Sequence, residues 1–372
     1  MRFRRSVLAS LMSLCSASNA AGGEGLTKPV KLPAFEAARA TCSAPIGFQK
    51  RLVFLQDNRR EFMQGVGRGL EAAARARGLD YSVAFANNDP VLMIKQLDGI
   101  FTDKTGAIVV APIDPPSLAP RLKKVIGAGT YVGAVVPPPA TTILNAPQYL
   151  TGEVLAKSAA DYIRARLGGK AKVVLLTHDS LRFLAPRFTA MRDTLRALPG
   201  VTIVADISPA TVDKEGGYRT MKTILLAHSN VDVVLGADTV VLGALAALRE
   251  AGKARPDQFL GGIDGELEAV AEIKRGGSPY KASISLASPI FGYAMGQHGA
   301  DWLDGKSIPQ AMDILPKALT NSNIADYERD TANPGAVYAN PARRASYLKM
   351  YGNICFDTRQ NYVNFPWSSE TR

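Results

Sequence analysis

Short apolar runs alternate with amphipathic helical stretches along most of the chain, and this alternation constrains the fold more than any other feature. In residues 231–253, VDVVLGADTVVLGALAALREAGK, an apolar run ends at Asp238 and a helical pattern begins. The runs are continuous rather than interrupted by a polar residue at every second position, which is typical of strands buried on both faces. Strands of this kind that alternate with helices form parallel sheets covered on both sides. The predicted fold class is therefore α/β with doubly wound parallel sheets.

The pattern predicts two lobes rather than one. Pro137, Pro138 and Pro139 end one apolar run, and the alternation of strand and helix resumes beyond them. A chain of 372 residues is also too long for a single ordinary core. Because ligands bind at the carboxyl ends of the strands in such sheets, two facing lobes would form a cleft between those ends. After Ile308 the pattern becomes irregular, polar and aromatic, which predicts a tail packed on the lobes.

The N-terminus has the features of a secretory signal. Basic residues at positions 2, 4 and 5 precede a short apolar run, and small residues follow at 18–20. We expect residues 1–20 to be a signal peptide that is cleaved after Ala20, and residues 21–48 to be a leader or linker. The later apolar runs are shorter than the roughly 18 residues that a transmembrane helix requires. The sequence therefore predicts export to the periplasm.

Two cysteines, Cys42 and Cys355, would remain in the exported chain. In an oxidising compartment this pair predicts a disulfide, which would tie the tail to the entry of the first strand. Two independent thiols are the alternative. With no CxxC motif and only three histidines in the chain, we expect neither a metal site nor a cofactor.

Charge and motifs exclude two broad classes of function. The net charge of +11 is dispersed, without a block of Lys and Arg, so we expect no nucleic-acid partner. The GxSxG, HExxH and Walker A motifs are absent, and GVGRG at 65–69 lies inside a helical pattern rather than after a strand. We therefore expect a protein that is not an enzyme.

Six segments together resemble the periplasmic sugar-binding proteins of the ribose-binding type. In chain order they are NNDPVLMIKQLDGI, GAIVVAPIDPPSLAPRLKKVIGAG, ADYIRARLGGKAKVVLL, MKTILLAHSNVDVVLGAD, LGALAALREAGK and GGIDGELEAVAEIKRGG. The resemblance covers roughly residues 51–306, and the tail and the cysteine pair lie outside the common pattern. It implies the fold of a type I periplasmic binding protein, in which two lobes joined by three hinge crossings close on a ligand.

The resemblance also implies domain boundaries and partners. Residues 49–144 with 287–315 would form the N-terminal lobe, residues 145–286 the C-terminal lobe, and residues 316–372 the last crossing and a packed tail. Such proteins hand a small molecule to the permease of an ABC transporter, and we expect this protein to be a monomer. The alternative is a sensor subunit that presents ligand occupancy to a membrane receptor kinase, and an enzyme is a remote third.

The resemblance places the first group of site residues after the first strand. Gln56, Asp57 and Asn58 follow that strand, where family members contact the ligand. A polar loop that caps the next helix is the alternative. Phe62 and Met63 align with two aromatic residues that stack on sugar rings, although Met63 is not aromatic. For these two, hydrophobic core at the start of the helix is the alternative.

Three charged residues complete the site that the resemblance implies. Arg187, in APRFTAM, matches an arginine that donates to ligand oxygens, a role that suits the forked guanidinium. A solvated helical arginine is the alternative. Asp264, in GGIDG, matches an aspartate that accepts from ligand hydroxyls, with a simple Asp-Gly turn as the alternative. Asp238 would either contact the ligand or cap its own helix.

Four positions depart from the family pattern in the same direction. Val136 stands where the family has the aspartate of an Asp-Arg pair, and Val212 lies near an expected cleft aromatic. Ala237 replaces an asparagine and Leu286 a glutamine. Because each hydroxyl of a free sugar needs a hydrogen-bond partner in the cleft, we expect a sugar-like ligand that is modified or less polar than a free aldose.

Overall fold

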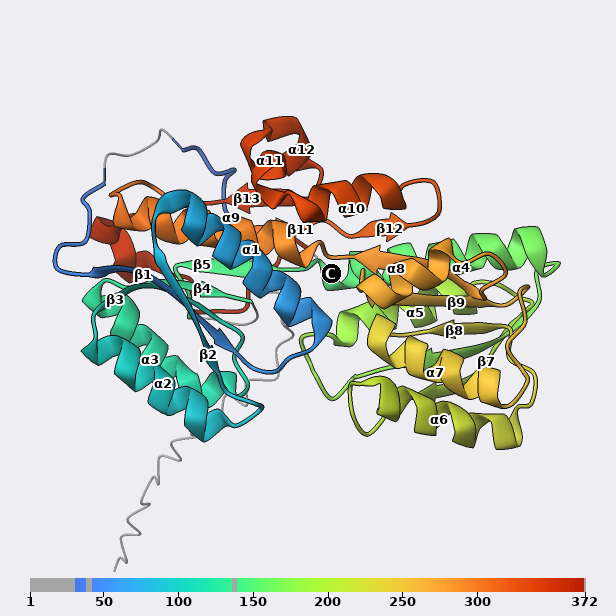
Figure 1. Ribbon diagram of the computed structural model, residues 1–372. Coiled ribbons are helices and arrows are strands. Elements are labelled where there is room, and N and C mark those ends of the chain that lie inside the picture. The colour runs from blue at the N-terminus through green and yellow to red at the C-terminus, as the bar shows by residue number, and fades with distance from the viewer. Residues whose placement is uncertain (1–30, 38–41, 136–138, 371–372) are drawn as a thin grey trace, which may run out of the picture.

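The computed structural model describes residues 31–37, 42–135 and 139–370. Their strands form two separate sheets, and each sheet is the centre of an α/β lobe (Figure 1). The prediction of two doubly wound lobes is confirmed. The predicted signal peptide at 1–20 and the departure at Val136 lie outside the described residues.

The N-terminal lobe is built on a seven-stranded sheet with the strand order β13-β11-β5-β4-β3-β1-β2. In chain order these strands are β1 (Gln49–Gln56), β2 (Asp80–Phe85), β3 (Thr105–Val110), β4 (Tyr131–Ala134), β5 (Thr142–Asn145), β11 (Ala311–Ile314) and β13 (Leu348–Tyr351). Neighbouring strands are parallel except for β11 and β13. Helices α1 (Glu61–Arg77) and α9 (Ser288–Leu303) cover one face, and α2 (Pro90–Thr102) and α3 (Pro115–Ala128) cover the other.

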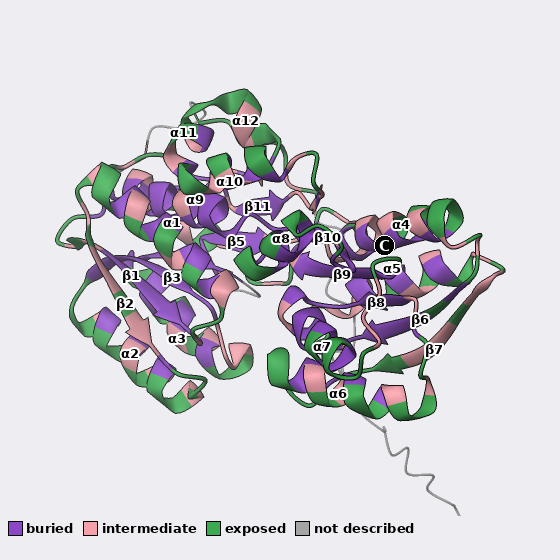
Figure 2. Ribbon diagram, turned by 45° about the vertical axis from the view of Figure 1, so that its right-hand side comes forward, coloured by how far each residue is buried: buried purple, intermediate pink, exposed green. Residues whose placement is uncertain are grey.

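Consecutive residues of β1 enter two different cores. Leu52 and Phe54 pack under α1 and α9, whereas Val53 and Leu55 pack against α2 and α3. Successive side chains of a strand point to opposite faces, so a strand covered on both faces must be apolar throughout. Figure 2 shows that buried residues continue along the inner strands of both sheets, whereas the edge strands β2 and β7 (Val201–Ile207) are partly exposed. This double coverage is the physical reason for the continuous apolar runs.

The C-terminal lobe is built on a six-stranded sheet with the strand order β12-β10-β9-β8-β6-β7. Its strands are β6 (Ala171–Leu176), β7 (Val201–Ile207), β8 (Val233–Leu235), β9 (Phe259–Asp264), β10 (Tyr280–Ser285) and the antiparallel β12 (Lys317–Leu319). Helices α4 (Gln148–Arg166) and α5 (Ala185–Arg196) pack together on one side of the sheet. Helices α6 (Lys214–Ala227), α7 (Asp238–Glu250) and α8 (Leu267–Lys274) form the other helical layer.

Within the described residues the chain passes between the two sheets at four places. The first three lie between β5 and α4, between β10 and α9, and between β11 and β12. These correspond in order to the three hinge crossings that the resemblance implies. The fourth is a helical connection of α10 (Ile324–Ala332), α11 (Pro334–Ala339) and α12 (Pro341–Ala345), which runs from β12 in one sheet to β13 in the other.

The two ends of the chain are held on the N-terminal lobe. Cys42 and Cys355 form a disulfide with a Cα–Cα distance of 5.6 Å, which confirms the predicted pair. Ahead of it, Ala34 forms a β-bridge with Tyr351 of β13, and the amide of Phe35 donates to the carbonyl of Met350 (3.0 Å). The described part of the predicted leader is therefore an extension of the N-terminal lobe rather than a free linker.

The C-terminal residues return to the first crossing between the lobes (Figure 1). The carboxylate of Glu370 accepts hydrogen bonds from the amides of Tyr149 (3.2 Å) and Leu150 (2.7 Å), at the start of α4. Asn145, the last residue of β5, donates to the carboxylate of Asp313 in β11 (2.7 Å). None of the helices in the described part of the chain is long and apolar enough to cross a membrane.

Candidate ligand site between the lobes

On the N-terminal lobe, the site residues expected after β1 form one hydrogen-bonded loop. The carboxylate of Asp57 accepts from the amide (2.7 Å) and side chain (3.2 Å) of Asn58 and from the guanidinium of Arg60 (3.1 Å). Gln56 donates to the carbonyl of Asn58 (2.5 Å). Burial raises the pKa of Asp57, against the opposing effects of Arg60 and the neighbouring amide. The loop is thus held in shape by its own polar groups.

Phe62 and Met63, at the start of α1, have different environments. Met63 is 2% exposed and belongs to the core of the N-terminal lobe. Phe62 is half-buried, and its ring centroid lies 5.7 Å from that of Phe291 on α9. The structure therefore favours the core alternative for Met63 and leaves part of the Phe62 ring accessible.

On the C-terminal lobe, Asp264 ends β9 in a backbone conformation with φ 129°, which residues other than glycine rarely adopt. Burial raises the pKa of its carboxyl group to about 6, Arg187 opposes that rise, and the neighbouring Asp238 adds to it. Among the described residues, no protein group donates a hydrogen bond to this carboxylate. Asp264 therefore combines an unusual backbone with an acceptor that the protein itself does not satisfy.

Arg187 lies on α5 and is only 5% exposed, which excludes the alternative of a solvated helical arginine. Its Nε donates to the side-chain oxygen of Gln148 on α4 (2.9 Å). Burial lowers the pKa of the guanidinium, and Asp264 opposes this effect. The two helices approach closely at Gly152 of α4, where a Cβ atom would lie 1.8 Å from the carbonyl oxygen of Arg187. Glycine at position 152 therefore sets the position of Arg187.

Asp238 is fully buried and is bound entirely by protein groups. Its carboxylate accepts from the amides of Gly265 (2.8 Å) and Glu266 (2.9 Å) and from the hydroxyls of Ser283 (2.6 Å) and Tyr280 (2.6 Å). It makes no side-chain cap on α7, so the interpretation of Asp238 as a cap of its own helix is wrong. Its geometry favours positioning the loop that carries Asp264 over direct contact with a ligand.

Two further residues of the C-terminal lobe were not identified from the sequence. Glu266 is 8% exposed, and burial, followed by the charges of Asp264 and Asp238, raises the pKa of its carboxyl group to about 9. It is therefore protonated at neutral pH and able to donate a hydrogen bond. His178 follows β6 and is 3% exposed, and its Nε2 has no partner among the described residues. The available signal was their position two residues beyond the ends of strands β9 and β6.

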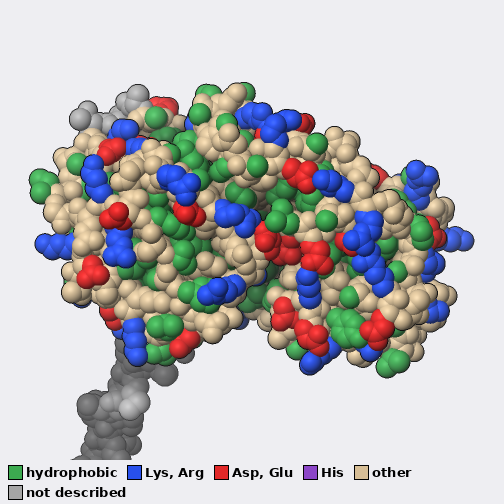
Figure 3. All heavy atoms as spheres, viewed as in Figure 1, with side chains coloured by type: hydrophobic (Ala, Val, Ile, Leu, Met, Phe, Trp, Pro, Cys, Tyr) green, Lys and Arg blue, Asp and Glu red, His purple; other side chains and the backbone are tan. Residues whose placement is uncertain are grey.

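The charged groups of the two lobes act on one another. Burial has the largest effect on the pKa of Asp264, followed by Arg187 and Asp238 of the same lobe. Arg60 of the N-terminal lobe also acts on this carboxyl group and lowers its pKa. Glu61, also of the N-terminal lobe, contributes to the raised pKa of Glu266. Figure 3 shows acidic and basic side chains meeting along the boundary between the lobes, where the surface is hollowed. The carboxyl ends of β1 and β9 thus contribute to one polar region.

The three described positions of apolar replacement differ in their exposure. Ala237 (8% exposed) and Leu286 (3%) are buried among core residues, whereas Val212, on the loop between β7 and α6, is 39% exposed.

Among the described residues, no group of three or more His, Cys, Asp or Glu side chains is arranged to hold a metal ion.

A separate cavity of about 360 Å³ lies between α9, the leader and the C-terminal helices. Its lining includes Cys42, His298, Tyr338 and Arg344, and none of the expected ligand-binding residues that the structure describes. The expected ligand-binding residues therefore lie outside this cavity.

Comparison with known proteins supports the family resemblance. A family model described as periplasmic binding protein domain matches residues 52–307. The chain is 23% identical over 272 residues to a ribose import binding protein of Bacillus subtilis, which covers 70% of this chain and 83% of that protein. It is 26% identical over 266 residues to a xylitol-binding protein of Mycolicibacterium smegmatis, which covers 69% of this chain and 73% of that protein.

Solved structures show the same fold. A 5-methylthioribose transporter solute-binding protein from Thermotoga lettingae, in complex with 5-methylthioribose, superposes with a TM-score of 0.67 at 21% sequence identity. The superposition covers 81% of this chain and 95% of that structure. The family match ends at residue 307, so α10, α11, α12 and β13 lie beyond it.

Proposed function

Because the chain belongs to the family of periplasmic binding protein domains, we propose that it clamps a small sugar-like molecule between its lobes and delivers it to a membrane permease. Members of the family work outside the cytoplasm as binding proteins rather than as enzymes. The proposal extends this general role to a class of ligand and to a partner. It also takes the protein to be a monomer that is released from its signal peptide after Ala20.

The observation that carries the proposal is the pair of opposite charges at Asp264 and Arg187. The Asp264 carboxylate has no hydrogen-bond donor among the described residues, and its φ of 129° costs about 1–3 kcal/mol. Arg187 is 5% exposed and makes no ion pair with a carboxylate among the described residues. Buried or strained polar groups that the protein leaves unsatisfied mark candidate binding sites. A ligand hydroxyl bound by Asp264 would contribute roughly 1.5–3 kcal/mol.

Ligands with hydroxyl groups and an apolar substituent fit these residues. Asp264 supplies an acceptor, and the protonated Glu266 supplies a donor. The accessible part of the Phe62 ring and the exposed Val212 supply apolar surface. One similar structure holds 5-methylthioribose, a compound of this type, and we extend that property to this chain as part of the proposal.

Thermal denaturation of the mature protein with D-ribose, xylitol and 5-methylthioribose tests the ligand class. A ligand that binds only the folded protein stabilises it by about 2.7 kcal/mol at a concentration 100 times its Kd. We expect the largest rise in Tm with 5-methylthioribose. An equal or larger rise with D-ribose would contradict the expectation of a less polar ligand.

Two variants and a matched control test the site. Asp264→Asn and Arg187→Gln should abolish the ligand-induced rise in Tm, because each removes one of the unsatisfied charged groups. Asp161→Asn removes the same charge from an exposed residue of α4, which pairs with Arg164 at 3.0 Å, and should leave the rise unchanged. Full ligand response in both site variants would refute the assignment.

The partner is tested separately. Crosslinking of the mature protein to membranes of its source organism should capture a permease, should require ligand and should give one copy of this protein per complex. Capture of a receptor kinase in place of a permease would favour the sensor that the sequence left as the alternative. A dimer in gel filtration at micromolar concentration would contradict the proposal of a monomer.

A further inference from the structure

The C-terminal helices contact the same loop that carries Asp264. The hydroxyl of Tyr327, on α10, donates to the carbonyl oxygen of Gly265 (3.3 Å), and its side chain is 5% exposed. Burial, with the nearby charges of Asp238 and Asp264, raises the pKa of this hydroxyl to about 12, so it remains a donor at neutral pH. Tyr327 lies beyond the matched family region at 52–307. Its contact with Gly265 is thus a feature of the C-terminal extension.

The backbone of Gly265 is held by three side chains. Its amide donates to Asp238 (2.8 Å) and to the hydroxyl of Ser283 (3.1 Å), both within the C-terminal lobe. Its carbonyl accepts only from Tyr327 among the described side chains. Because φ is 129° at Asp264 and 72° at Gly265, this turn is costly for an L-residue and depends on its contacts. Loss of any one of them should loosen the turn.

Helix α10 is attached to the C-terminal lobe by two further contacts. Lys274 of α8 forms an ion pair with Glu328 of α10 (2.9 Å). Asn323, which precedes α10, donates to the carbonyl of Ala318 in β12 (2.8 Å). The start of the connection therefore moves with the lobe that carries Asp264.

The other end of the connection belongs to the N-terminal lobe. Strand β13 pairs with β11 in the N-terminal sheet. Tyr338 of α11 packs against Tyr293 of α9, with ring centroids 5.7 Å apart. The guanidinium of Arg344 lies over the Tyr338 ring, 5.0 Å from its centroid, and donates to the Tyr338 carbonyl (2.9 Å).

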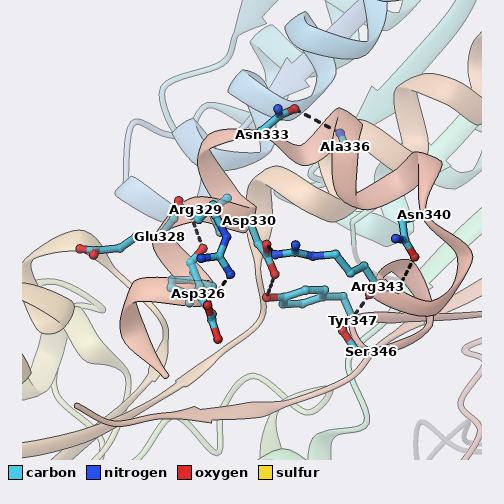
Figure 4. Close-up of polar contacts among 12 residues, drawn as sticks. Asp326, Glu328, Arg329, Asp330, Asn333, Ala336, Asn340, Arg343, Ser346 and Tyr347 are labelled. Atoms are coloured by element: carbon cyan, nitrogen blue, oxygen red, sulfur yellow. Dashed lines mark hydrogen bonds and ion pairs between the residues drawn. The ribbon is translucent and has the colours of Figure 1, made fainter. Parts of the chain in front are cut away.

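A buried polar cluster joins the two ends of the connection. Figure 4 shows Asp330 of α10 facing both Arg343 of α12 and Tyr347, which precedes β13. Asp330 is 6% exposed, and it accepts from the Tyr347 hydroxyl (2.7 Å) and pairs with Arg343. The cluster makes α10, α12 and the start of β13 one unit, so a contact of α10 is mechanically connected to the N-terminal sheet.

We propose that Tyr327 is a positioning residue of the ligand site, through which the helical connection α10–α12 joins the loop Asp264–Glu266 to the N-terminal lobe. Rotation of one lobe against the other must then disturb the Tyr327 contact or the contacts of α11 and α12. The orientation of Asp264 and Glu266 is therefore coupled to the angle between the lobes. The inference rests on the proposed function only in taking this loop as the ligand loop.

Hydrogen–deuterium exchange of the ligand-free protein tests the positioning role. Tyr327→Phe removes the hydroxyl that holds Gly265, and the loss of one neutral hydrogen bond should speed local exchange of the Gly265 and Glu266 amides roughly fivefold. Tyr162→Phe is the matched control, because it removes a hydroxyl that likewise donates to a backbone carbonyl of the C-terminal lobe, that of Asp257 (3.2 Å), outside the helical connection. It should change exchange at Gly265 and Glu266 less than twofold.

The outcomes separate positioning from general stabilisation. If both variants speed amide exchange at Gly265 and Glu266 equally, Tyr327 only stabilises the fold and the proposal is wrong. The proposal is also wrong if Tyr327→Phe does not speed this exchange. No solute is present in this experiment. A failure of the whole sugar panel would therefore refute the proposed ligand class and leave the exchange result intact.

A second measurement tests the coupling to the lobes. Spin labels at Lys95→Cys on α2 and Leu226→Cys on α6 report the distance between lobes, because both side chains are exposed. Glu328→Gln breaks the ion pair to α8 and should broaden the distance distribution at low salt. Asp326→Asn is the control, since Asp326 pairs with Arg329 within α10. Identical distributions for Glu328→Gln and the unsubstituted protein would refute the coupling.

Discussion

Asp238 offers the sharpest test of how the C-terminal lobe is held together. Its carboxylate is 0% exposed and accepts from four donors, two amides of the loop after β9 and two hydroxyls of β10. Burial raises the pKa of this carboxyl group despite these hydrogen bonds. All four hydrogen bonds together stabilise this part of the lobe. Removal of the carboxylate should therefore lower the free energy of unfolding far more than loss of one surface contact.

The expected magnitudes differ for two substitutions. Asp238→Ala leaves all four donors without their acceptor, and a buried donor without a partner costs about 1–3 kcal/mol. Because the two hydroxyls of Ser283 and Tyr280 can turn to other acceptors, we expect a total loss of about 3–5 kcal/mol. Asp238→Asn keeps the shape and one oxygen, which can still accept from the two amides and Ser283, so we expect about 1–2 kcal/mol. Such losses are large against the usual 5–15 kcal/mol of a domain.

Urea denaturation with two probes measures the effect in the correct lobe. The chain has two tryptophans, and Trp302 and Trp367 both pack in the N-terminal lobe. Far-ultraviolet circular dichroism reports both lobes, whereas tryptophan fluorescence reports mainly the N-terminal one. Asp238→Ala should shift the circular dichroism transition to lower urea before the fluorescence changes. A loss below about 1 kcal/mol, or an earlier fluorescence transition, would refute the network argument.

Three further outcomes are expected. Because burial raises the pKa of Glu266 from 4.5 to about 9, its contribution to stability is full below pH 4.5 and is lost as the pH rises towards 9. In urea titrations Glu266→Gln should therefore gain stability relative to the unsubstituted protein at pH 8 but not at pH 4. Gly152→Ala should lower the Tm and weaken ligand binding, because its Cβ would meet backbone at 1.8 Å, whereas Gly99→Ala, with nothing within 4 Å, should be neutral or stabilising. Reduction of the disulfide, which spans 313 residues, should cost roughly 3–5 kcal/mol, measured as a lower urea midpoint.

The arrangement of strands could be predicted because buried parallel strands carry their signal in consecutive residues. The run KVVLLTH needs no distant information to be identified as the strand now described as β6. The location of Asp264 at a strand end also follows from the local pattern GGIDG. Its contact with a ligand remains a prediction.

The role of Asp238 could not be predicted for a physical reason. Its partners Tyr280 and Ser283 lie 42 and 45 residues further along the chain. They reach Asp238 only because β10 lies beside β9 in the folded sheet. The local sequence shows an acidic residue at the start of a helix, which is the usual signal of a cap. Glu266 was missed for a similar reason, because its raised pKa depends on burial in the folded lobe and on the charges of Asp264 and Asp238.

The fourth connection between the lobes could not be predicted from the local sequence either. The segments that form α10, α11 and α12 are short and interrupted by Pro334 and Pro341, so their periodicity is too brief to distinguish helices from an irregular tail. The cysteine pair was the one long-range signal in this region, and it correctly connected Cys355 to the leader. That bond places the end of the chain on the N-terminal lobe but carries no information about the return through β12.

The described environments change what the apolar replacements imply about the ligand. Ala237 and Leu286 are buried in the core, so their lack of polar groups is also explained by packing. Val212 alone among the three described replacements is substantially exposed. Asp264 and Arg187, by contrast, carry charges that the protein leaves available for a partner. These residues favour a ligand with hydroxyl groups at one end and an apolar group at the other over one that is uniformly less polar than an aldose.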